Sequence, residues 1–81
     1  MTKMEYAKCE KLMEEAIRKA ESSKREYNRA EIFSKKNNDV INAEIELRKA
    51  DQHIGYADGI NQVLVTIGFK HDRMKELSKL L

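Results

Sequence analysis

The sequence predicts an all-α protein in which two long helices form an antiparallel, coiled-coil-like hairpin, a short third helix follows, and two copies dimerise into a helical bundle. Three observations carry this prediction. The 81 residues contain no proline and only three glycines, so long helices meet few interruptions. Apolar residues recur at alternating spacings of three and four, which is a heptad pattern. A polar break, "KKNND" at residues 35–39, divides that pattern in two.

Length and composition predict one domain, residues 1–81, in the cytoplasm. Charged residues make up 37 % of the chain, and a net charge of +2 is too mild to indicate nucleic-acid binding by itself. No apolar run approaches the roughly 18 to 20 residues of a membrane span, and the first residues lack the apolar core of a signal peptide. Cys9 is the only cysteine, which fits a reducing compartment. We therefore expect no membrane partner.

The first helix is predicted over residues 3–36, where small residues dominate the heptad seam. The seam residues are Tyr6, Cys9, Met13, Ala16, Ala20, Ser23, Tyr27, Ala30 and Ser34. Small side chains suit a close approach between helices better than a bulky leucine zipper does. On the exposed face, acidic residues precede basic residues by four positions, which supports a solvated helix surface. These pairs are Glu14–Arg18, Glu15–Lys19, Glu21–Arg25 and Glu31–Lys35.

The polar break predicts a turn, and the second helix is predicted over residues 40–67. Asn37 or Asn38 can adopt the left-handed backbone conformation, and Asp39 suits the N-cap position. Because the break is short, we expect the second helix to run antiparallel to the first. Two apolar stripes on the second helix indicate more than one neighbour. The seam stripe is Val40, Ala43, Leu47, Ala50, Ile54, Ala57 and Leu64, and the second stripe is Tyr56, Ile60, Val63 and Ile67.

The residues after the second helix predict a glycine cap and a short third helix over residues 72–81. Gly68 suits a helix C-terminus, with Phe69 folded back onto the last turn. Asp72 is expected to cap the third helix, which is too short to be stable alone. The third helix therefore needs a docking surface, and we expect that surface to be the second stripe of the second helix.

Gly55 and Gly59 weaken the second helix, because a glycine in a helix interior costs about 1 kcal/mol relative to alanine. Three interpretations stay open: another backbone packs over the missing side chains, the helix bends, or the glycines are tolerated on a solvated face. From the helical periodicity, we expect both glycines to lie roughly opposite the second stripe. We expect a homodimer that buries this part of the helix. The candidate self-association residues are Gly55, Gly59, Tyr56, Ile60, Val63 and Ile67.

The sequence shows no catalytic or metal-binding pattern, so we expect a protein without enzymatic activity, metal or cofactor. His53 and His71 are the only histidines, and neither has a partner at a metal-ligand spacing. Both are expected on the solvated surface. Cys9 lies on the heptad seam and is expected to be a small buried side chain rather than a nucleophile.

A basic cluster in the first helix indicates an alternative partner, because lysine and arginine side chains bind phosphate. The cluster consists of Arg18, Lys19, Lys24, Arg25, Arg29, Lys35 and Lys36. No convincing helix-turn-helix accompanies it, so a DNA-associated regulatory role is the alternative to protein binding. Tyr6, Tyr27 and Tyr56 are candidate protein contacts wherever they are exposed, although a core position is favoured for Tyr27.

The stretch "ADGINQVLVTIGF", after a long charged helix and an Asn/Asp break, resembles small helical-hairpin proteins from phages and prophages of Gram-positive bacteria. The local part of this resemblance is residues 55–69. It implies a regulator or inhibitor without enzymatic activity that binds a host or phage protein, and it carries over no functional residue. We therefore expect a small interaction protein that binds an unidentified protein partner through exposed helix faces.

Overall fold

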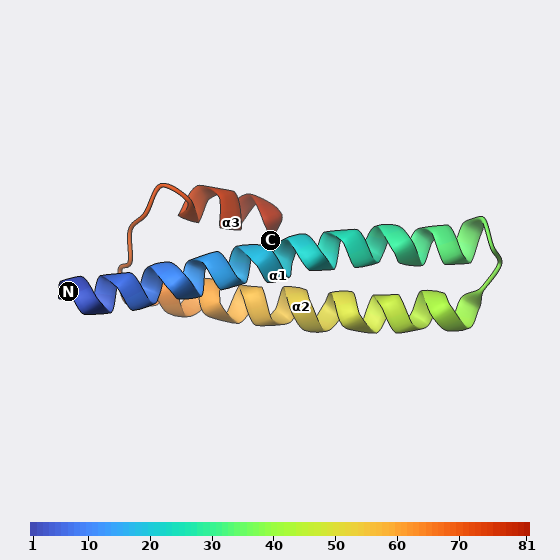
Figure 1. The fold of residues 1–81 in the computed structure, drawn as a ribbon, viewed down its shortest axis with the longest axis horizontal. Coiled ribbons are helices and arrows are strands. Elements are labelled where there is room, and N and C mark those ends of the chain that lie inside the picture. The colour runs from blue at the N-terminus through green and yellow to red at the C-terminus, as the bar shows by residue number, and fades with distance from the viewer.

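The chain turns back after its first helix, so that two long helices lie side by side (Figure 1). The computed structural model describes all residues, 1–81. Helix α1 spans Lys3–Lys35, α2 spans Val40–Thr66 and α3 spans Met74–Leu80. The chain contains no strand, which confirms the all-α prediction.

The turn between α1 and α2 uses the residues that the sequence indicated. Asn38 adopts the left-handed conformation with a φ of 52°. The Asp39 carboxylate caps α2 by accepting a hydrogen bond of 3.1 Å from the backbone N–H of Asn42. The side-chain amide of Asn42 donates to the same carboxylate at 2.6 Å. These two bonds, the backbone bond first, favour the charged form and lower the pKa of Asp39 below its usual range.

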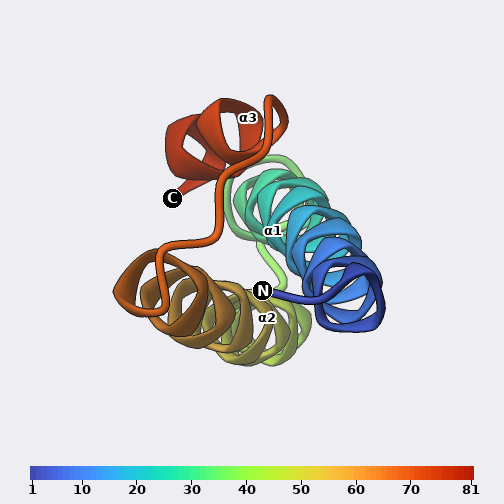
Figure 2. The same ribbon diagram turned by 90° about the vertical axis from the view of Figure 1, so that its left-hand side faces the viewer.

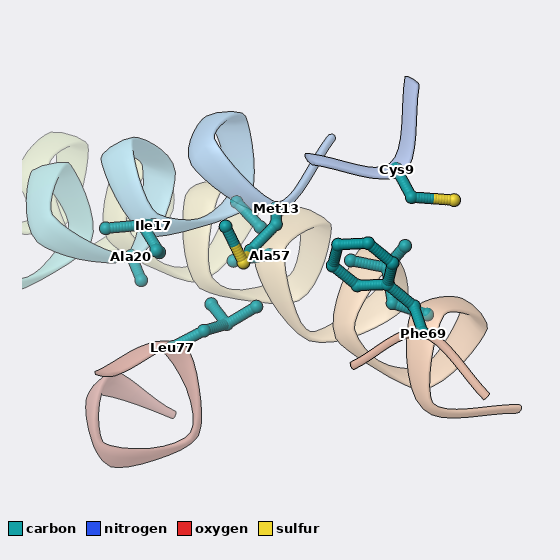
Figure 3. Packing of buried hydrophobic residues seen from close by; sticks show 9 residues of the cluster. Cys9, Met13, Ile17, Ala20, Ala57, Phe69 and Leu77 are labelled. Carbon is teal, nitrogen blue, oxygen red and sulfur yellow. The ribbon is translucent and has the colours of Figure 1, made fainter. Parts of the chain in front are cut away.

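Alanine dominates the contact between α1 and α2. The buried alanines of the two helices are Ala16, Ala20, Ala30, Ala43, Ala50 and Ala57. Larger side chains are fully buried only at one end of the hairpin, where Leu77 of α3 joins Met13 and Ala57 in one cluster (Figure 3). Cys9 is 8 % exposed in the same cluster, so its predicted burial is confirmed. Small side chains let the two backbones approach closely but bury little apolar area.

Gly68 ends α2 in the way that the sequence predicted. Its φ of 77° is in the left-handed region that favours glycine. The N–H of Gly68 donates to the carbonyl of Val65 at 3.1 Å, and the N–H of Phe69 donates to the carbonyl of Leu64 at 2.9 Å. This pair of bonds is a Schellman motif, and it folds Phe69 back into the core, where its side chain is 5 % exposed.

Helix α3 packs on α1, so the prediction that it docks on the second stripe of α2 is wrong (Figure 2). The segment between α2 and α3 explains the difference. The ring of Phe69 lies 5.1 Å from the ring of Tyr6, and Nε2 of His71 lies 2.9 Å from Oε2 of Glu10. Both contacts fix the segment to α1 and direct α3 along the same helix. The second stripe of α2 is therefore left uncovered.

Helix α3 begins at Met74, two residues later than predicted, and Asp72 is not its cap. Arg73 occupies the N-cap position, and no side chain accepts a hydrogen bond from the first turn. The backbone N–H of Arg73 instead donates to Nδ1 of His71 at 3.0 Å. This bond holds residues 71–73 in a turn before the helix begins.

Candidate interaction surface on α2

An apolar groove of about 480 Å³ runs along one side of α2, and no residue of α3 lines it. Its lining residues are Leu12, Gly55, Tyr56, Gly59, Ile60, Val63 and Leu64. The groove thus brings together all but one of the predicted self-association residues, and the remaining one, Ile67, is 53 % exposed at the end of α2. We define the groove face by the residues Gly55, Tyr56, Gly59, Ile60, Val63 and Ile67.

The two glycines lie beside the second stripe, so the interpretation that placed them opposite it is wrong. Residues four apart advance by only about 40° around an α-helix. Gly55, Gly59 and Val63 therefore follow one another in one row, next to the row of Tyr56 and Ile60. A Cβ atom added at either glycine meets no atom within 4 Å. The missing side chains thus contribute to the groove, and nothing within the chain packs over them.

The groove face is exposed and uncharged. Tyr56 is 47 % exposed and Val63 is 57 % exposed. The sequence has no Asp, Glu, Lys or Arg between Asp58 and Lys70. A contiguous exposed apolar surface of this kind is a candidate binding surface.

Two tyrosines connect the long helices in a reciprocal way. The hydroxyl of Tyr56 on α2 donates to Oε1 of Glu15 on α1 at 2.9 Å. The hydroxyl of Tyr27 on α1 donates to Oδ1 of Asp51 on α2 at 2.5 Å. The hydrogen bond to each carboxylate favours the neutral phenol and raises the pKa of both tyrosines. Each helix therefore supplies one donor and one acceptor to the other.

Glu26 is a buried acidic residue that the heptad seam did not predict. It is 3 % exposed, and its Oε1 lies 2.5 Å from Nδ1 of His53. The sequence contained a signal for the burial of Glu26, because Ser23, Glu26 and Ala30 also follow the three-four spacing of the seam. The structure buries Glu26 and leaves Tyr27 40 % exposed, so the favoured core position of Tyr27 is wrong.

The two histidines are partly buried contacts between elements, and the solvated positions predicted for them are wrong. His53 joins α2 to α1 through its bond with Glu26, and His71 joins the α2–α3 segment to α1 through Glu10. The ring of His71 also stacks on Phe69 at 6.0 Å. No group of three or more His, Cys, Asp or Glu side chains is arranged to hold a metal ion.

The predicted acid-base pairs along α1 form only in part. Nζ of Lys35 lies 2.8 Å from Oε1 of Glu31, and this ion pair lowers the pKa of Glu31 and raises that of Lys35. The other pairs form no ion pair, and Nη2 of Arg25 donates to Oγ of Ser22 at 3.0 Å. An exposed pair of this kind contributes little to stability.

Several members of the basic cluster of α1 already contact neighbouring side chains. Nε of Arg29 lies 3.3 Å from Oε2 of Glu46 on α2. Lys24 lines a space between α1 and α3 that Lys79 also lines. Arg25 and Lys35 have the partners described above. The remaining members are Arg18, Lys19 and Lys36.

No protein-family model, curated protein or solved structure matches this chain. None of the three helices combines the length and the apolar character needed to cross a membrane.

Proposed function

We propose that this chain is a small interaction protein without enzymatic activity, which binds a protein partner through exposed helix faces and so modulates it. The observation that carries this proposal is the groove face of α2, which is exposed, apolar and uncharged. Such a surface is stabilised when another helix covers it. One form of the proposal is a dimer in which two antiparallel hairpins form a helical bundle.

The resemblance of residues 55–69 to small hairpin proteins of Gram-positive phages supports the role of a modulator of a host or phage protein, and we propose that it acts in the cytoplasm. The mixed charges of α1 support protein binding over DNA binding, since Arg29 and Lys35 are already paired with acidic side chains. A surface that binds the phosphate backbone needs cations that are free to release counterions.

A capture experiment with matched variants tests this function. The tagged chain is incubated with nuclease-treated lysate of the source cell, and bound proteins are identified by mass spectrometry. Val63→Glu places a charge in the groove face. Val65→Glu is the matched control, because Val65 is 61 % exposed on the same helix but does not line the groove.

We expect one protein to be captured by the wild type and by Val65→Glu but not by Val63→Glu. Because apolar contact drives this binding, capture is expected to persist as salt is raised. Equal capture by all three chains contradicts the proposed surface. Nucleic acid captured only without nuclease, and lost steeply with salt, supports the basic cluster of α1 instead.

A further inference from the structure

The structure points to a particular occupant of the groove face. We propose that this occupant is α2 of a second copy of the chain, and that the two helix backbones are in contact at Gly55 and Gly59. This inference rests on the proposed function, because it uses the same face. It adds the identity of a partner and the position at which the helices cross.

The glycines carry the first step of the inference. Both lie inside α2, which continues unbroken from Val40 to Thr66. Each weakens that helix, and nothing in the same chain uses the space that its missing side chain leaves. A pair of small residues four apart lets a second helix approach closely, toward the lower end of the usual range of about 8 to 10 Å between helix axes. A crossing helix accounts for both glycines at once.

The charge distribution carries the second step. In a two-fold symmetric dimer the same patch lies on both sides of the interface, so any exposed charge near the axis faces its own copy. The groove face has no charged residue, whereas the exposed face of α1 is densely charged. The groove face can therefore meet its own copy without bringing like charges of its own residues together. The row of Tyr56 and Ile60 can pack beside the glycine row of the other copy as a ridge in a groove.

The surface area carries the third step. The chain exposes 5892 Å², and it is 52 Å long and 17 Å wide in both other directions. A compact protein of 9.5 kDa exposes about 5,000 Å². The excess of about 800 to 900 Å² matches the roughly 800 Å² that each partner contributes to an interface of standard size. The surface that this elongated chain exposes is therefore compatible with one interface of standard size to a second copy.

Sedimentation equilibrium tests the inference on the full chain with four proteins: the wild type, Gly55→Ala/Gly59→Ala, Val63→Glu and Val65→Glu. Alanine has free space at both glycines in the single chain and is the better helix former. The double alanine variant is therefore expected to raise the Tm of the dilute monomer by several degrees. In the proposed dimer, the two added methyl groups push apart helix backbones that are otherwise in contact. The dissociation constant of the double alanine dimer is therefore expected to be at least tenfold higher than that of the wild type.

We expect the wild type and Val65→Glu to form dimers at tens of micromolar and Val63→Glu to be monomeric. A double alanine variant that dimerises as tightly as the wild type overturns the crossing at Gly55 and Gly59. If Val63→Glu still loses its captured partner in that case, the proposed function stands without this inference. A wild type that is a folded monomer at tens of micromolar removes the second copy as the occupant, while the capture experiment continues to test the groove face independently.

Discussion

Nδ1 of His53 lies 2.5 Å from Oε1 of Glu26, and this contact joins α2 to a side chain of α1 that is almost completely buried. Oε2 of Glu26 is buried without any hydrogen-bond partner. A buried carboxylate in this position depends on the single group that it contacts. His53 is therefore a structural partner of α1, although it is only partly buried itself.

Replacement of His53 by alanine is expected to lower the free energy of unfolding by about 3 kcal/mol, because it leaves a buried carboxylate unpaired. Replacement of Glu26 by methionine is expected to be neutral or stabilising, since an apolar side chain of similar size needs no partner. In the Glu26→Met background, His53→Ala is then expected to have a much smaller effect. Urea unfolding of the four proteins of this double-mutant cycle measures the coupling. If His53→Ala lowers the free energy of unfolding equally in both backgrounds, the two residues are not coupled.

Replacement of Gly68 is expected to destabilise the protein, and the loss depends on how readily the new residue adopts the left-handed backbone conformation. The φ of 77° is easy for glycine, moderately unfavourable for asparagine and most unfavourable for alanine. Gly68→Ala is expected to cost about 1 kcal/mol, and Gly68→Asn less. The free space around a Cβ atom at this position excludes a steric clash as the cause. Thermal unfolding measures the order, and an alanine variant as stable as the wild type contradicts it.

The features that the sequence predicted correctly depend on local signals. The left-handed Asn38, the cap at Asp39 and the glycine cap at Gly68 each follow from a few neighbouring residues. The alanine-rich seam of α1 follows from its heptad spacing. Such signals act within one or two helical turns, so a single sequence is sufficient to read them.

The features that the sequence did not predict depend on contacts between distant elements. Between Ser23 and Ala30, the three-four spacing can be completed by either Glu26 or Tyr27. The position of α2 decides that Glu26 is the buried residue. Likewise, α3 lies on α1 because Phe69 and His71 contact residues near the start of the chain. The sequence predicted most of the residues that line the groove. That the space beside Gly55 and Gly59 is open is seen only in the structure.

The cap at Asp39 is expected to make stability depend on acidic pH. The pKa of Asp39 is lowered in the folded chain, so its contribution is present above the usual Asp value of 3.8 and is lost as pH falls through the lower folded value. The asparagine side chain of an Asp39→Asn variant can also cap the helix but does not titrate in this range. The stability advantage of the wild type over this variant is therefore expected to shrink from about pH 5 to about pH 2.

Urea midpoints of the wild type and Asp39→Asn across that range measure the effect. Asp39→Ala, which cannot cap the helix, serves as the control and is expected to be less stable than both at neutral pH. Because all other carboxylates are shared by the proteins, their titration cancels in the difference. A constant difference between wild type and Asp39→Asn at every pH would show that the charge of Asp39 plays no part.

The two tyrosine contacts are expected to make stability depend on alkaline pH. Because hydrogen bonds to Asp51 and Glu15 raise the pKa values of Tyr27 and Tyr56, their contribution is present below the usual tyrosine value of 10.0 and is lost as pH rises through the higher folded values. A Tyr27→Phe/Tyr56→Phe variant lacks both contacts at every pH. We expect it to be less stable than the wild type at about pH 8, and the difference to narrow above about pH 11 as the phenols ionise beside carboxylates. Urea midpoints measure the difference, and ultraviolet absorbance of phenolate follows the ionisation directly. If the difference stays constant while the phenolate signal rises, the two hydrogen bonds do not hold α1 and α2 together.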